Sequence, residues 1–373
     1  MIHELPRHFI VLVDGTWVSA SRSDPNSENS NIYKLNYLLK THNHAHEAQV
    51  TMYIPGIGSK TDGNAMFAGA LADGLERQIE VVYTNICSNF VPEKHDNEEQ
   101  YIGDKLYLFG FSRGAVTAWI VADIITKCGL LKCSEISTYD EIFKHYITSR
   151  GEDDDKKFKD QLNEKIWKDV KIELLGLFDT VIGNYRRLPS ESLIKTFDNN
   201  RKVLSKDVKN IIHVLAMNET RLFFNPILFD AKDDKDQTLN QIWMPGCHSD
   251  IGGTYRDNDL LGKMSLLTMI NKIKDLRIKL GFNDDKIQKD FIHVIETALQ
   301  NDSGFIIHDE RYVGKLYSER NLEDKCNQFI HPFYEELKPN LAMDNSIINY
   351  AEKRDLPFGD KFSQLPIADE HFP

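Results

Sequence analysis

A serine between two glycines lies where a nucleophile is expected. The segment Gly110-Phe111-Ser112-Arg113-Gly114 has the pattern GxSxG and follows an apolar run directly, and a run compatible with a helix comes next. In a strand–serine–helix turn of this kind, Gly110 and Gly114 leave room for the strand and the helix to pack closely. The pattern therefore predicts a nucleophilic Ser112 with an exposed Oγ. The alternative is a glycine-rich turn without chemistry.

A serine nucleophile needs a base and an acid, and candidates for both follow later apolar runs. Asp179 closes the run that begins at residue 171, and His248 comes just after the run that begins at residue 240. The order Ser, Asp, His is typical of hydrolases whose serine lies on such a turn. We therefore predict Ser112 as the nucleophile, His248 as the general base and Asp179 as the acid that orients it.

Other residues compete for the roles of acid and base. Glu219 ends the next apolar run, and Asp250 lies two residues after His248, so both are alternatives to Asp179. The position of Asp250 favours a role in shaping the histidine loop. Weaker candidates for the base are His213, His308 and His331.

Backbone N–H groups are expected to stabilise the oxyanion of an ester transition state. Arg113 would supply one of them, because it opens the helix after Ser112 and the helix dipole adds to the effect. Gly15 or Thr16 would supply the second, from the loop after the first apolar run, with Asp14 as a supporting residue. The alternative for Asp14 is that it only caps a turn.

A different interpretation uses carboxylates alone. Asp14, Asp179 and Asp250 all lie at expected strand ends, where they could hold Mg²⁺ or Ca²⁺. This interpretation leaves Ser112 and His248 without a role. We therefore expect chemistry that needs no metal and no organic cofactor.

A parallel sheet is expected to position these residues. Short apolar runs alternate with helical patterns, which is typical of an α/β fold with a mostly parallel sheet buried on both faces. In such sheets, ligands bind outside the carboxyl ends of the strands. Strands are predicted at residues 8–16, 49–58, 105–112, 171–180, 210–219 and 240–249, and helices at 31–40, 65–88, 113–128, 138–149 and 260–280.

The chain divides into a core and an extension. We expect the catalytic core at residues 1–260 and a C-terminal helical extension at residues 261–373 that packs on it, because no clear strand is predicted beyond about residue 262. The charge-dense segments 150–168 and 230–237 are expected to be solvent-exposed insertions.

Composition excludes several classes of protein. The 373 residues include 45 Lys+Arg and 57 Asp+Glu, a net charge of −12 that argues against a nucleic-acid binder. Neither GxxxxGK[ST] nor GxGxxG is present, which disfavours a phosphate-binding NTPase. The five cysteines form no CxxC pair and indicate reduced thiols in a cytoplasmic protein. We find no signal-peptide pattern and no apolar stretch of about 20 residues, so membrane contact is expected to be peripheral.

Several blocks of the sequence resemble a known family. The resemblance is to the α/β-hydrolase domain of the type VI secretion phospholipase effectors of class 1, and it covers about residues 8–260. The blocks are DGTW (14–17), YIPGIG (53–58), GDKLYLFGFSRGA (103–115), LGLFDTV (175–181), HVLAMNETRLFF (213–224) and PGCHSDIGGTY (245–255).

The resemblance implies an α/β-hydrolase fold and a serine hydrolase that cleaves acyl esters of glycerophospholipids, as a phospholipase A1 or A2 does. It further favours a membrane-damaging bacterial effector, either a toxin delivered to another cell or an antiphage defence protein acting at the inner membrane. A housekeeping lipid hydrolase is the alternative role. The expected partners are a phospholipid membrane surface and an immunity or activator protein. The alternatives are a carboxylesterase of small soluble esters and a non-catalytic binding module on the same scaffold.

Overall fold

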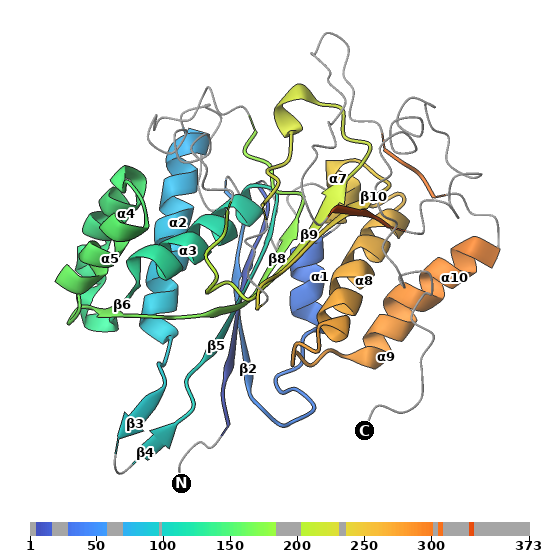
Figure 1. Ribbon diagram of the computed structural model, residues 1–373. Helices are drawn as coiled ribbons and strands as arrows, with labels where there is room; N and C mark the ends of the chain where they lie inside the picture. Colours follow the sequence, from blue (N-terminus) through green and yellow to red (C-terminus); the bar gives the residue numbers. More distant parts are fainter. Residues whose placement is uncertain are drawn as a thin grey trace.

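The computed structural model describes residues 5–16, 29–57, 70–96, 99–183, 203–230, 236–300, 305–308 and 328–331. Within these residues, seven strands form one sheet in which every neighbouring pair is parallel, and helices cover both faces (Figure 1). The predicted α/β fold with a parallel sheet is therefore confirmed. The strands of the sheet are β1 (His8–Val13), β2 (Gln49–Ile54), β5 (Lys105–Phe111), β8 (Ile172–Phe178), β9 (Asn210–Ala216), β10 (Thr238–Met244) and β11 (Gln328–Ile330).

The helices lie between the strands, and most begin and end close to their predicted bounds. Residues 65–69 of the predicted second helix lie outside the described residues. The α-helices are α1 (Asn31–Leu38), α2 (Ala70–Asn89), α3 (Arg113–Cys128), α4 (Tyr139–Thr148), α5 (Glu152–Gln161), α7 (His248–Gly252), α8 (Leu260–Asp275), α9 (Asp284–Ile287) and α10 (His293–Gln300). Two short antiparallel pairs lie outside the main sheet: β3 (Lys94–Asp96) with β4 (Glu99–Tyr101), and β6 (Leu130–Leu131) with β7 (Ile166–Trp167).

The alternation of side chains along each strand divides the core into two layers. On β1, Val11 packs in the cluster that includes α2 and α3, whereas the next residue, Leu12, packs in the cluster that includes α1 and α8. Successive side chains of a strand point to opposite faces, so a strand covered on both faces has to be apolar throughout. Figure 1 shows α2 and α3 on one side of the sheet and α1 and α8 on the other.

The order of the strands places a topological switch point beside the GxSxG segment. The sheet runs β11-β10-β9-β8-β5-β1-β2, so the chain leaves β1 outward to β2 and then returns to the other side of β1 at β5. The loops after β1 and β5 therefore diverge at one edge of the sheet. Such a crevice is where open α/β sheets bind their ligands.

In the outer regions, one strand was not predicted, and one charged segment is exposed as predicted. Strand β11 extends the sheet beyond β10, although no strand is predicted after residue 262; its three residues are too few for a periodic signal. The charged segment 150–168 contains α5, whose side chains are mostly exposed, as predicted. Residues 231–235 of the other charged segment lie outside the described residues.

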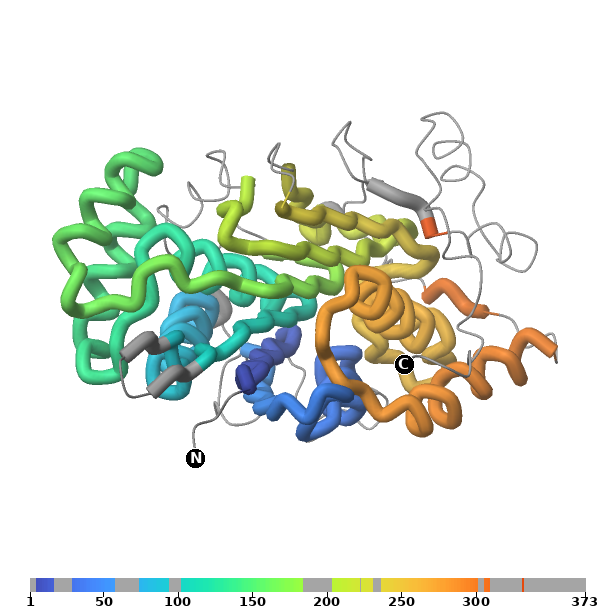
Figure 2. The backbone as a smooth tube through the Cα atoms, turned by 60° about the horizontal axis from the view of Figure 1, so that its bottom comes forward, coloured from blue at the N-terminus to red at the C-terminus, as the bar shows by residue number. Residues whose placement is uncertain are grey.

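The C-terminal helices pack on the sheet. Side chains of α8 and of α10 share one hydrophobic cluster with Ile10 and Leu12 of β1. Figure 2 shows α8, α9 and α10 on the opposite side of the molecule from α4 and α5. Among the described residues, no helix combines the length and the apolar character that crossing a membrane requires.

Candidate active site

Ser112 lies on a strained turn between β5 and α3. Its backbone has φ 57° and ψ −124°, a region that costs a residue with a side chain about 1–3 kcal/mol. Only glycine fits at the two flanking positions, because a side chain would clash with the backbone. A Cβ on Gly110 would lie 2.4 Å from the carbonyl oxygen of Gly114, and a Cβ on Gly114 would lie 2.3 Å from the carbonyl oxygen of Val13. The close packing expected of a nucleophile turn is therefore present.

The three residues predicted to act together meet at the carboxyl edge of the sheet. Nε2 of His248 lies 2.8 Å from Oγ of Ser112, and Nδ1 of the same ring lies 2.6 Å from Oδ2 of Asp179. Ser112 follows β5, Asp179 follows β8, and His248 begins α7 just beyond β10. The arrangement can pass a proton from a serine hydroxyl to an imidazole that a buried carboxylate orients.

Asp179 is held in place by the backbone around it. The residue is fully buried, has a φ of 41°, and accepts the N–H of Ala216 at its second oxygen, Oδ1, at 3.0 Å. The N–H of the next residue, Thr180, donates to Nε2 of His213 at 3.1 Å. His213 is thus a buried core histidine that supports the loop, in line with its position inside an apolar run.

The ring nitrogens of His248 bond to Asp179 and Ser112, whereas Glu219 and Asp250, the two rival acids, bond to other groups. Glu219 pairs with Arg221 at 2.7 Å and accepts the backbone N–H of His248 at 3.2 Å. Burial raises the pKa of Glu219, but the hydrogen bond and the charge of Arg221 outweigh it, and the net pKa is lowered. Asp250 accepts the N–H of Cys247 at 2.9 Å and so shapes the turn into α7. Glu219 and Asp250 therefore hold the histidine loop.

Two aromatic rings enclose the imidazole. The ring of Phe111 stacks on His248 at a centroid distance of 4.8 Å, and the ring of Phe224 meets it edge-on at 5.1 Å. Arg221 covers the outer face of Phe224 with its guanidinium carbon 3.6 Å from the ring centroid. Because only 5% of His248 is exposed, these contacts limit its access to water and fix its orientation.

The loop after β1 lies directly against the serine. A Cβ on Gly15 would lie 3.3 Å from Cβ of Ser112, and a Cβ on Gly56 would lie 1.5 Å from the carbonyl oxygen of Gly15. The N–H of Gly15 donates to Oδ1 of Asp14 at 2.8 Å. Within the described residues, the N–H groups of Thr16 and Arg113 take no part in a backbone hydrogen bond of a turn or loop. Of the three predicted donors, Gly15 is engaged by Asp14, which leaves the N–H groups of Thr16 and Arg113 to face an oxyanion.

Asp14 holds that loop in place through hydrogen bonds of its carboxylate. Its Oδ2 accepts the hydroxyl groups of Ser30 at 2.6 Å and of Tyr53 at 2.7 Å. Burial raises the pKa of Asp14 to about 6, although the hydrogen bonds from Ser30, Tyr53 and Gly15 act in the opposite direction. The carboxylate therefore links the ends of β1 and β2 to the N-terminal cap of α1.

His308 contacts α7 and the residues that follow it. Its Nδ1 lies 2.6 Å from Oδ1 of Asp250, its Nε2 lies near the exposed Asp257, and its ring stacks on Tyr255 at 3.6 Å. Burial lowers the pKa of His308, but the hydrogen bond and charge of Asp250, aided by Asp257, outweigh it and raise the net pKa. His308 thus anchors the segment 305–308 against the histidine loop. The third weak candidate, His331, donates its backbone N–H to the carbonyl of Trp243 at the edge of the sheet.

The carboxylates proposed for a divalent cation are occupied by different partners. Asp179 contacts His248, Asp14 contacts Ser30, and Asp250 contacts His308. Among the described residues, the only close group of metal-ligating side chains lies elsewhere. The geometry thus favours the serine interpretation over the interpretation with a cation.

Most of the chain matches a known family. Residues 7–272 match the family described as "T6SS, Phospholipase effector Tle1-like, catalytic domain". The chain belongs to this family. The resemblance of the blocks at residues 14–17, 103–115, 175–181 and 245–255 is thereby confirmed. No curated protein matches the chain.

Two solved structures match part of this Tle1-like chain. One is the "Structure of the Tle1 effector bound to the VgrG spike from the Type 6 secretion system", at 20% identity and a TM-score of 0.35, covering 69% of this chain and 52% of that one. The other is the "Crystal structure of an uncharacterized protein from Pseudomonas aeruginosa", at 15% identity and a TM-score of 0.42, covering 79% of this chain and 51% of that one. The chain spans about half the length of both.

The sequence predicted Asp14 and Asp250 as supporting residues but gave no such role to Ser30, Tyr53, Phe224 or His308. Tyr53 and Phe224 fall in blocks shared with the Tle1-like family, so the blocks carried a signal without indicating a role. Ser30 is recognisable only as a helix cap, which it also is: its Oγ accepts the N–H of Tyr33. His308 lies 58 residues after Asp250, and no local pattern links the two.

Proposed function

We propose that the chain is a serine hydrolase of the α/β-hydrolase fold that cleaves acyl esters of glycerophospholipids. The observation that carries the proposal is the continuous chain of hydrogen bonds from Ser112 through His248 to Asp179, at a strained strand–helix turn. Membership of the Tle1-like phospholipase effector family supports the choice of a lipid ester. The strand order, with the serine at the switch point, supports the fold.

In this mechanism Ser112 attacks the acyl carbonyl while Nε2 of His248 takes its proton. Asp179 holds the proton of Nδ1 and stabilises the imidazolium. The N–H groups of Arg113 and Thr16 then donate to the oxyanion, where each well-placed donor is worth about 10²–10³ in rate. The imidazolium returns its proton to the leaving alcohol, the lysophospholipid, and water releases the fatty acid in a second step of the same kind.

Exposed apolar side chains flank the site and support a lipid substrate. Phe223, next to the Phe224 that contacts His248, leaves 41% of its surface exposed, and Ile306, two residues before His308, leaves 48% exposed. Single exposed apolar residues are common, but these two lie on segments that both contact α7 or its histidine. Binding at a lipid interface grows with the apolar area that it buries.

The test measures fatty-acid release from vesicles of phosphatidylethanolamine and phosphatidylglycerol, with a short-chain nitrophenyl ester assayed in parallel. The wild-type protein is expected to hydrolyse the lipid and the Ser112→Ala variant is not. Lipids with different acyl chains at the two glycerol positions then distinguish A1 from A2 cleavage. Hydrolysis of the short ester alone would favour the small-ester carboxylesterase, and no hydrolysis of either, with stoichiometric vesicle binding, would favour the non-catalytic module.

We further propose that this activity damages membranes, as expected of a bacterial effector. The support is the family itself, whose description names type VI secretion. Production of the wild-type protein in a bacterial host should lower viability and raise the lysophospholipid content, whereas the Ser112→Ala variant at equal abundance should do neither. Full viability with unchanged lipids in cells producing active enzyme would contradict this role.

A further inference from the structure

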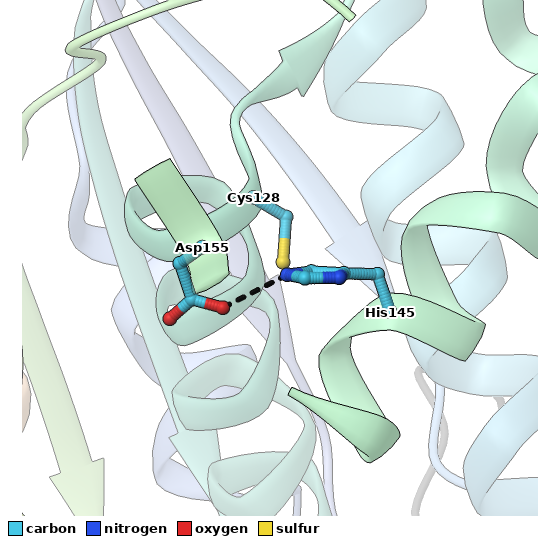
Figure 3. A group of neighbouring side chains, drawn as sticks. All are labelled: Cys128, His145 and Asp155. Atoms are coloured by element: carbon cyan, nitrogen blue, oxygen red, sulfur yellow. Dashed lines mark hydrogen bonds and ion pairs between the residues drawn. The ribbon is translucent and has the colours of Figure 1, made fainter. Parts of the chain in front are cut away.

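A thiol, an imidazole and a carboxylate converge on the side of the molecule away from the serine. Cys128, His145 and Asp155 each direct one metal-ligating atom toward the others, and these atoms all lie within 4.8 Å of one another (Figure 3). Cys128 is the last residue of α3, His145 lies in the last turn of α4, and Asp155 lies in the first turn of α5. Three helices thus contribute one ligand atom each.

The group is enclosed. Cys128 is fully buried, and the side chains of His145 and Asp155 are only 12% and 11% exposed. Nε2 of His145 lies 2.9 Å from Oδ1 of Asp155. Figure 3 shows the sulfur of Cys128 beside the same edge of the imidazole that faces Asp155. The sulfur and the carboxylate therefore approach the same ring nitrogen, whereas in a catalytic relay they would approach opposite nitrogens.

Neighbouring side chains hold two of the three groups in this orientation. The ring of Phe158 stacks on His145 at a centroid distance of 3.9 Å with the planes 4° apart, and Oγ of Ser149 donates to Oδ1 of Asp155. Contacts of this kind around a metal site orient its ligands. Lys159 of α5 donates to the carbonyl of Thr126 at the end of α3.

We infer that Cys128, His145 and Asp155 bind one divalent transition-metal ion of the zinc type, with water as the fourth ligand. Thiolate, imidazole and carboxylate are the protein ligands of Zn²⁺, whereas Mg²⁺ and Ca²⁺ prefer oxygen alone. A dication is neutralised by one thiolate and one carboxylate, so the buried site would carry no net charge. Binding would release the thiol proton to solvent.

The geometry requires small adjustments only. Tetrahedral zinc with bonds of about 2.0–2.3 Å separates its ligand atoms by about 3.2–3.6 Å. Since no pair lies more than 4.8 Å apart, the widest pair would close by at most about 1–1.5 Å, and the pair of His145 and Asp155 at 2.9 Å would open slightly. Side-chain rotation can supply both movements. The fully buried Cys128 ends a helix and is expected to move least.

The ion would act as a structural clamp. The helix α3 begins after Ser112 and ends at Cys128, and its 16 residues span about 24 Å. An ion at this distance takes no part in ester hydrolysis. It would instead fix the outer helices α4 and α5 to the helix that carries the nucleophile, so its failure to bind would leave the proposed hydrolase reaction untouched.

The experiment uses the full chain, stripped with a chelator and equilibrated with Zn²⁺ or Co²⁺. The wild-type protein should bind one Zn²⁺ per chain by elemental analysis, melt a few degrees higher with the ion, and show a thiolate-to-Co²⁺ charge-transfer absorption. Cys128→Ser should weaken binding by more than about 100-fold, beyond the 10–100-fold typical of supporting residues. The matched control is Cys133→Ser, which removes an exposed thiol five positions away and should bind like wild type.

A second variant keeps the inference falsifiable if Cys128→Ser does not fold. His145→Gln replaces a partly exposed side chain and should abolish the charge-transfer band and the gain in melting temperature. The inference is overturned if zinc binds at well below one equivalent, if Co²⁺ binds without a thiolate band, or if the Cys128→Ser or His145→Gln variant binds zinc as tightly as Cys133→Ser.

Discussion

Nδ1 of His248 lies 2.6 Å from Oδ2 of Asp179, whereas Glu219 reaches only the backbone N–H of His248, at 3.2 Å. The two carboxylates therefore act on different parts of the same residue. Asp179 can select the tautomer of the ring, and Glu219 can only fix the loop that carries it. The distinction matters because the sequence alone left both residues, together with Asp250, as candidates for the acid.

Replacing the acid should separate these roles. Asp179→Asn is expected to lower kcat by about 10⁴-fold with the fold retained, because the amide favours the wrong tautomer of His248. Glu219→Gln should lower kcat by about tenfold or less. It should also lower the melting temperature, because it weakens the ion pair with Arg221. Initial rates on a soluble ester and thermal melts of both variants are the measurements. A larger loss of kcat in Glu219→Gln than in Asp179→Asn would reverse the assignment.

The raised pKa of Asp14 predicts a pH-dependent stability. In the unfolded chain its pKa is near 3.8, and in the folded protein it is about 6, so between these values the native state binds more protons. The contribution of this residue to stability is therefore present below pH 4 and falls as the pH rises to about 6, by at most about 3 kcal/mol. Asp14→Asn mimics the protonated form and removes this slope.

The measurement compares the free energy of unfolding of wild type and Asp14→Asn by denaturant titration at several pH values. Relative to the variant, the wild-type protein should lose stability between pH 4 and pH 7. A difference that stays constant over this range would show that Asp14 is already ionised near its ordinary pKa. Other carboxylates titrate in both proteins and cancel in the comparison.

The raised pKa of His308 predicts a loss of stability at higher pH than that of Asp14. Its folded pKa is raised above 6.5, so the stability from its contact with Asp250 is complete below pH 6.5 and is lost as the pH rises through the folded value. His308→Ala should therefore lower the melting temperature more at pH 6 than at pH 9. The exposed His293 of α10 provides a control, since His293→Ala should lower it little at either pH. Equal losses at both pH values in His308→Ala would exclude the ion pair.

The exposed apolar residues predict a difference between lipid and soluble substrate. The double variant Phe223→Ser, Ile306→Ser removes apolar surface that we expect to enter the lipid interface. Its rate on vesicles should therefore fall by tenfold or more, which corresponds to a loss of about 1.4 kcal/mol of interfacial binding for each tenfold. Its rate on a short soluble ester should stay within about twofold. The control is Val294→Ser, an exposed apolar residue of α10. Equal losses on both substrates would place the effect in the active site and not at the interface.

Much of the site could be predicted because it depends on local patterns. Continuous apolar runs require a sheet covered on both faces, and the residues that close those runs meet at one edge once the strands are parallel. This reasoning brought Ser112, Asp179 and His248 together although 136 residues separate the first from the last. The glycines at 110 and 114 are explained by the same turn.

The remainder depends on tertiary contacts that carry no local signal. Phe224 lies beyond the strand predicted at residues 210–219, and only the fold brings its ring edge-on to His248. Strand β11 has three residues and gains its place by pairing with β10, which no periodic pattern could reveal. Gly15 and Thr16 were equivalent donors in the sequence, and the bond from the N–H of Gly15 to Asp14 separates them.

Covalent labelling tests the central claim most directly. An activated nucleophilic serine reacts with a fluorophosphonate, so the wild-type protein should gain one phosphonyl group per chain, and peptide mapping should place it on Ser112. Ser112→Ala should not be labelled, and His248→Ala should be labelled far more slowly, because the base is missing. Labelling at another residue, or a wild-type protein that remains unlabelled while it hydrolyses phospholipid, would contradict the account.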